Sequence, residues 1–168
     1  MNWNDKGYVL TQLKNDGLLL ESASDELKND EEIVLAAIAQ DKESFVYASD
    51  KLKNDKEFVA RAMETEPWVF EFVSDNLRAD PDIVLQACKE NWMLLGYADE
   101  VLQWDEQFLI KAIKHNPQII QCTDKEFQIN NREFVIDVLK QNRGLIETEE
   151  DICEELRADE EVASLLAL

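Results

Sequence analysis

Histidine and glycine are scarce in this sequence of 168 residues, which contains one histidine, four glycines and three prolines. The glycines form no phosphate-cradling loop, and His115 belongs to no nucleophile–histidine pattern. The three cysteines, Cys88, Cys122 and Cys153, are odd in number and show no CxxC or CxxH spacing. We therefore expect no metal site, no cofactor and no enzymatic activity, and we interpret the cysteines as reduced thiols in or near a core.

Long apolar stretches are also missing. The longest spans residues 33–39, far short of the roughly 20 residues that cross a bilayer. The first residues lack the basic start and apolar run of a secretory signal. We therefore expect a soluble, cytoplasmic protein.

Acidic residues dominate the charge, with 37 of them against 17 basic residues and a net charge of −20. A surface this negative repels nucleic acid and anionic lipid at long range and attracts basic surfaces. The expected partner is therefore a protein with a basic surface, and direct binding to nucleic acid or membrane is not expected.

Aspartate recurs every 25 residues, at Asp5, Asp30, Asp55, Asp80 and Asp105. A period of this length is typical of a stacked array, because one unit cannot bury its own apolar face. The repeats span 4–28, 29–53, 54–78, 79–103 and 104–128. An irregular sixth repeat covers 129–157, with Asn131 as its cap and extra residues around 147–151, and Asp159 opens a partial repeat over 158–168. We expect one all-α domain over residues 1–168, a helical-repeat solenoid or superhelix of about six and a half helix-turn-helix units.

Within a repeat, counting from the aspartate as position 0, apolar residues at positions 3, 4, 7 and 8 describe one face of an α-helix. Position 0 is the expected N-cap, and alanine at position 7 in four repeats favours a close helix crossing. Position 11 is a second expected N-cap, occupied by Asp16, Asp41, Glu66, Asn91 and Asn116. Each of the three prolines directly follows a cap, as expected at the first residue of a helix.

The second helix is expected over positions 12 to 22, with positions 14, 15, 18 and 22 buried. Its end stays open, because the Ser-Asp-x-Leu motif at 24–27, 49–52 and 74–77 offers side chains that compete for backbone groups. At the end of the chain, Leu165, Leu166 and Leu168 either cover the sixth repeat or join two copies of the chain end to end.

The stretches NDEEIVLAAIAQ, YASDKLKNDKEFV and SDNLRADPDIVLQA share this pattern. Together they resemble the tandem helical repeat family named domain of unknown function 4116, from Asn4 to about Ala163. The resemblance implies an α-solenoid that acts as a binding scaffold, with no catalytic residues to assign. It also implies delivery into a host cytoplasm as a second location, since the family includes secreted bacterial effectors. Departures are Gln103-Trp104 at a junction, and Gly7, Gly17 and Gly96 inside helices.

Two sets of acids are candidates for partner binding. Positions 1 and 2 hold Glu31, Glu32, Glu57, Asp82 and Glu106, which the helix dipole also explains. Position 20 holds Asp25, Asp50, Asp75 and Glu100. These acids are expected near the end of the second helix, where the dipole disfavours acid, so they favour a functional acidic surface. Solvated faces without a function are the other interpretation.

Trp68 and Trp92 begin the second helix in their repeats and are the candidate aromatic contacts, with local core packing as the alternative. Trp104 precedes a cap and is expected to staple onto Leu109. The sequence thus favours a non-enzymatic protein–protein interaction scaffold that binds a basic partner along an extended acidic surface. The alternative is an acidic nucleic-acid mimic that inhibits a target protein by occupying its DNA- or RNA-binding cleft.

Overall fold

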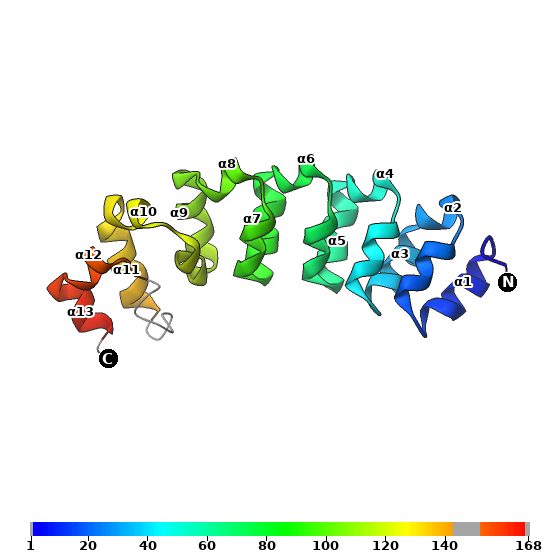
Figure 1. Ribbon diagram of the computed structural model, residues 1–168, viewed down its shortest axis with the longest axis horizontal. Helices are drawn as coiled ribbons and strands as arrows, with labels where there is room; N and C mark the ends of the chain where they lie inside the picture. Colours follow the sequence, from blue (N-terminus) through cyan, green and yellow to red (C-terminus); the bar gives the residue numbers. More distant parts are fainter. Residues whose placement is uncertain (1, 143–151, 167–168) are drawn as a thin grey trace.

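The computed structural model describes residues 2–142 and 152–166. Helical units follow one another in a single elongated row, with the two termini at opposite ends (Figure 1). Every regular element in this part of the chain is a helix. The all-α helical-repeat solenoid expected from the sequence is therefore confirmed.

Each of the first five repeats contains a long α-helix, a 3-10 helix and a short α-helix. The long helices are α1 (Lys6–Leu13), α3 (Glu31–Ile38), α5 (Lys56–Thr65), α7 (Pro81–Glu90) and α9 (Glu106–His115). The 3-10 helices are η1 (Gly17–Ser22), η2 (Lys42–Tyr47), η3 (Pro67–Phe72), η4 (Trp92–Tyr97) and η5 (Pro117–Cys122). The short helices are α2 (Asp25–Lys28), α4 (Asp50–Lys53), α6 (Asp75–Arg78), α8 (Glu100–Gln103) and α10 (Lys125–Asn130). Beyond them lie α11 (Arg132–Gln141), α12 (Glu154–Arg157) and α13 (Glu160–Leu166).

The expected second helix is wrong as a single element. It divides into a 3-10 helix over positions 12 to 17 and a separate short α-helix from position 20. Serine causes the division in the first three repeats: the Ser49 hydroxyl accepts the Leu52 N–H at 3.2 Å and so caps a new helix. The preceding residue, Ala48, is extended, which separates the two helices.

Both expected cap positions are confirmed in the five regular repeats. Asp30 Oδ1 accepts the Ile33 N–H at 3.2 Å at position 0, and Asp41 Oδ1 accepts the Glu43 N–H at 2.8 Å at position 11. The three prolines occupy the first turn of their helices, as expected. The sixth repeat differs, because Asn131 stands at the N-cap without capping. Its Nδ2 instead donates to the Phe127 carbonyl at 3.0 Å.

The core is a continuous ribbon between neighbouring repeats. Long helices contact the next long helix, and 3-10 helices contact the next 3-10 helix. The alanines at position 7 are fully buried, as the predicted close crossing requires: Ala37, Ala62, Ala87 and Ala112. Neighbouring repeats therefore bury one another's apolar faces.

Backbone hydrogen bonds also join the short helices of successive repeats, which lie along one edge of the row (Figure 1). Ser49 N–H donates to the Lys28 carbonyl at 2.9 Å, and Ser74 N–H donates to the Lys53 carbonyl at 3.1 Å. Asp99 N–H continues this series to the Arg78 carbonyl at 2.9 Å. These hydrogen bonds fix the position of each of these repeats relative to the next.

At the C-terminal end α13 packs on α11, with Val162 fully buried and Leu165 half-buried against the core. Leu165 thus covers the preceding repeat. The side chain of Leu166, Leu168 and the extra residues around 147–151 lie outside the described residues, so the end-to-end pairing stays a prediction. Within residues 2–142 and 152–166, no helix has the length and apolarity to cross a membrane.

Candidate protein-interaction surface

Basic residues at position 1 of three repeats reach the acids of the following repeat. Lys6 Nζ lies 2.7 Å from Asp30 and 2.8 Å from Glu32. The same arrangement recurs with Lys56 between Asp80 and Asp82 and with Arg132 between Asp159 and Glu161. We call these three groups the inter-repeat clamps. Each clamp joins the first turn of one long helix to the N-cap of the next.

The clamps also hold their cap carboxylates in the charged form. Burial by itself raises the pKa of Asp80, but the hydrogen bond from Lys56 and those from the Ile83 and Asp82 N–H groups outweigh it. The pKa of Asp80 therefore lies below its usual range, and that of Asp30 is lowered in the same way through Lys6. These acids stabilise the stack of repeats.

The candidate acids at positions 1 and 2 consequently fall into two groups. Glu32 and Asp82 belong to clamps, and Glu31 accepts from Arg61 of the next repeat at 2.6 Å. Glu57 and Glu106 form no ion pair within the described residues. The ladder of free acids inferred from the sequence is therefore interrupted by structural ion pairs.

The position-20 acids lie elsewhere than expected. Asp25, Asp50, Asp75 and Glu100 are each the first residue of a short helix and do not lie near the end of a long one. The helix dipole favours acid at an N-terminus, so the argument that it disfavours them is wrong. Asp75 also pairs with Arg78 at 2.5 Å. Their placement alone no longer indicates a binding surface.

Two candidate tryptophans are engaged within the fold. Trp68 is half-buried, with Lys42 Nζ 4.9 Å from its ring centroid and the Tyr97 ring edge-on at 6.2 Å. Trp92 is half-buried against the core. Trp104 instead stays 60% exposed, so the expected staple onto Leu109 leaves most of its ring in solvent. The exposed tryptophan is thus the one that the sequence argument assigned to packing.

Trp104 marks a junction where the regular contact between repeats is missing. At two earlier junctions an asparagine accepts a serine hydroxyl at 2.7 Å, in the pairs Asn29–Ser49 and Asn54–Ser74. Trp104 and Asp124 occupy the corresponding positions between the fourth and fifth repeats. Among the described residues, the Asp124 N–H makes no backbone bond that would continue the series of short helices. The surface opens there.

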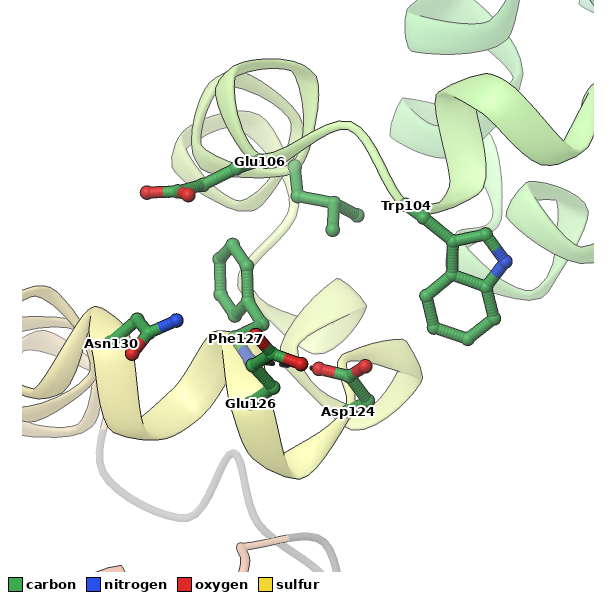
Figure 2. Close-up of a pocket in the computed structure, with 7 residues that line it drawn as sticks. Trp104, Glu106, Asp124, Glu126, Phe127 and Asn130 are labelled. Carbon is green, nitrogen blue, oxygen red and sulfur yellow. Dashed lines mark hydrogen bonds between the residues drawn. The ribbon is translucent and has the colours of Figure 1, made fainter.

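The opening is a depression of about 290 Å³ that we call the Trp104 depression (Figure 2). Trp104 follows α8, Glu106 begins α9, and α10 supplies Glu126 and Phe127. Buried Phe127 and Leu109 contribute apolar surface, while Glu106 and the acids of α10 lie around the opening (Figure 2). The residues that line it are Trp104, Glu106, Leu109, Asp124, Glu126, Phe127 and Asn130.

The charge of this depression is uncompensated within the described part of the chain. Asp124 accepts the Phe127 N–H at 2.7 Å and caps α10, while Glu106 and Glu126 form no ion pair there. Lys125, the nearest base in sequence, pairs with Glu155. An exposed indole and three carboxylates that line one depression suit a cation on an aliphatic stem, which stacks on the ring and donates to the acids nearest it.

Sequence reasoning missed Asp124 and Glu126 and misassigned Trp104. The available signal was the coincidence of two departures from the repeat: Trp104 in place of asparagine or alanine, and Asp124 in place of serine at the matching position twenty residues later.

The thiols and metal-ligating groups offer no second site in residues 2–142 and 152–166. Burial raises the pKa of the Cys88 thiol to about 12, and the pKa of half-buried Cys122 is also raised by burial. All three cysteines are free, as expected of reduced thiols in or near the core. No group of three histidine, cysteine or carboxylate side chains in this part of the chain is placed to hold a metal ion.

The stacked three-element repeats define an α-helical repeat protein with one irregular, open junction. More narrowly, the chain belongs to the family described as Domain of unknown function (DUF4116), whose model matches residues 5–53, 38–78 and 80–128. Comparison with curated proteins and with solved structures gives no match.

Proposed function

We propose that the chain is a non-enzymatic protein–protein interaction scaffold whose Trp104 depression binds a basic side chain of its partner. One observation carries the proposal: a 60% exposed tryptophan lines the same depression as Glu106, Asp124 and Glu126, which form no ion pair with a described base. An exposed large aromatic in a hollow is typical of a binding surface, where tryptophan is enriched among energetically important contacts.

Arginine and lysine fit this hollow for the same reason. A guanidinium or ammonium over an indole face contributes about 0.5–2 kcal/mol, and carboxylates accept charge-assisted hydrogen bonds from it. A neutral polar side chain would gain neither contribution. An acidic side chain would meet three like charges.

The acids outside the clamps support the proposal at longer range. A net charge of −20 raises the association rate of a basic partner, while contacts at the depression determine its dissociation rate. Glu57 and the exposed position-20 acids belong to this steering field. Glu32 and Asp82 contribute less, because their charge is shared with clamp lysines.

The test is fluorescence anisotropy with a labelled arginine peptide and a matched peptide in which citrulline, the uncharged analogue, replaces arginine. We expect saturable binding of the arginine peptide only, weakened about tenfold by Trp104→Ala or Glu126→Gln, which is the loss of roughly 1.4 kcal/mol. Glu64→Gln, the same charge change at an exposed position of α5, is the control and should leave the affinity nearly unchanged. Equal binding of both peptides, or equal loss with Glu64→Gln, would contradict the proposal.

Nucleic-acid mimicry is the second candidate, and the net charge of −20 favours it. A phosphate backbone carries no interspersed cations, whereas Lys6, Lys56 and Arg61 lie within the acidic ladder. The interaction scaffold is therefore the better supported function. Affinity capture from the native host at low salt, followed by a DNA-competition assay on each captured protein, separates the two, because only a mimic displaces duplex DNA.

A further inference from the structure

Position 17 carries a row of aromatic side chains on the 3-10 helices. Tyr47, Phe72 and Tyr97 are the last residues of η2, η3 and η4, and all three are half-buried. Together with Leu18 of η1 they line an open groove of about 490 Å³ that crosses four successive repeats. Its lining shares no residue with that of the Trp104 depression, so the two are separate surfaces.

The groove wall is held in place by contacts inside the fold. Lys42 pairs with Glu71 at 3.3 Å and lies over the Trp68 ring, which in turn meets the Tyr97 ring edge-on. Four side chains from three repeats thus fix one another. Because these side chains are already fixed, a ligand that binds here loses little free energy in ordering them.

The groove wall also carries polar groups that could bind a ligand. Within the described residues, the hydroxyls of Tyr47 and Tyr97 make no hydrogen bond, and Glu43 at the rim forms no ion pair. Val46, also part of the lining, is 47% exposed. The groove therefore offers apolar surface, two free hydroxyl donors and one carboxylate.

The spacing of the row selects the shape of the ligand. Packed helices of successive repeats lie about 8–10 Å apart. A polyproline II chain advances about 9.3 Å in its three-residue turn, so every third side chain lies on one face. An α-helix returns to the same face about every 5.4 Å, so one turn is shorter than that step and two turns, about 10.8 Å, are longer. A polyproline II chain also leaves its carbonyls free to accept from tyrosine hydroxyls.

We propose that this groove binds an extended, proline-rich peptide that places an apolar side chain at every third position against Tyr47, Phe72 and Tyr97, with a basic residue near Glu43. Tyrosine-lined grooves that recognise polyproline II segments use the same physics, because the preformed chain loses little entropy on binding. The negative charge of Glu43 determines which end of the bound peptide carries the basic residue.

The experiment uses two fluorescent peptides of equal composition, four Pro-Pro-Leu triplets followed by one arginine, and a version in which the leucines are moved off the three-residue period. We expect the periodic peptide to bind saturably to the full chain and at least fivefold more tightly than the shuffled one, about 1 kcal/mol or more. Tyr47→Phe with Tyr97→Phe removes only the hydroxyls, and about tenfold weaker binding is expected. Circular dichroism confirms that this variant stays folded.

Both peptides are also measured in the Trp104→Ala background, where their arginine no longer has the Trp104 depression as a second site, so a failure here is distinguishable from a failure of the basic-side-chain proposal. Equal affinity for periodic and shuffled peptides, or no saturable binding to the folded chain, overturns the inference. A leucine-rich helical peptide that competes for the same tyrosines and binds more tightly would also overturn it.

Discussion

Lys56 donates from Nζ to both carboxylate oxygens of Asp80, at 2.9 Å each, and so ties the first turn of α5 to the N-cap of α7. Asp80 thereby has two roles, since its Oδ1 also accepts the Asp82 and Ile83 N–H groups. One carboxylate couples helix capping to the stacking of neighbouring repeats.

The clamp predicts how stability depends on pH. Because the pKa of Asp80 is lowered in the folded chain, its contribution is present above the ordinary carboxyl pKa and is lost as pH falls through the lowered value. Lys56→Met removes the hydrogen bond that contributes most to lowering this pKa. We therefore expect this variant to be less stable than the parent at neutral pH and equally stable in strong acid. Urea unfolding followed by circular dichroism at a series of pH values measures the difference.

Asp80→Asn provides the control for that experiment. Asparagine keeps the helix cap but cannot titrate. In this background, Lys56→Met should change stability less, and most of the pH dependence of its effect should disappear. A pH-independent loss in the parent background would assign Lys56 to packing alone.

Ser44 is a second point where stability can be tested. Its hydroxyl is fully buried in η2 and has no hydrogen-bond partner among the described residues, at a position where the other regular repeats carry Leu19, Val69, Leu94 and Ile119. Removing an unsatisfied buried hydroxyl recovers its desolvation cost, so Ser44→Ala should raise the free energy of unfolding by about 1 kcal/mol. Ser49→Ala, which deletes the cap of α4 and the bond to Asn29, should lower it by about 1 kcal/mol. Destabilisation by Ser44→Ala would show that the hydroxyl has a partner.

Two glycines inside 3-10 helices differ in what surrounds them. A Cβ on Gly17 would lie 2.4 Å from the Ala37 carbonyl oxygen, whereas a Cβ on Gly96 would meet nothing within 4 Å. Gly17→Ala must therefore push η1 away from α3, and a loss of about 1–3 kcal/mol is expected. Gly96→Ala should be neutral or stabilise by up to about 1 kcal/mol, because it restricts the unfolded chain. Thermal unfolding of the two variants side by side distinguishes these outcomes.

The sequence predicted the features that a single repeat contains. Caps at Asp30 and Asp41, the prolines after caps and the buried alanines all follow from local spacing. The 3-10 helices did not follow, because the six residues of a segment such as η2 are too few to distinguish a period of 3.0 from one of 3.6. Misplacing Asp50 and its counterparts was a direct consequence.

Contacts between repeats could not be predicted from the spacing of residues within one repeat. Lys6 and Asp30 lie 24 residues apart, and their pairing depends on how far each repeat is displaced from the last. The open junction beside Trp104 likewise reflects the placement of successive short helices, since among the described residues the Asp124 N–H makes no backbone bond that continues their series. Both required the superhelical geometry, which no single repeat specifies.

The last prediction concerns the asparagine–serine hydrogen bond, for which Trp104 and Asp124 provide no counterpart. Trp104→Asn combined with Asp124→Ser introduces the pair that joins Asn29 to Ser49 and Asn54 to Ser74 at 2.7 Å. We expect the double variant to regain this hydrogen bond and to be more stable than the sum of the two single variants by roughly 0.5–1.5 kcal/mol in a double-mutant cycle. Its affinity for the arginine peptide should also fall, because the indole and one carboxylate of the Trp104 depression are removed. Additive single effects with retained peptide binding would mean that the junction is open for a reason other than this pair, and that the cation binds elsewhere on the acidic surface.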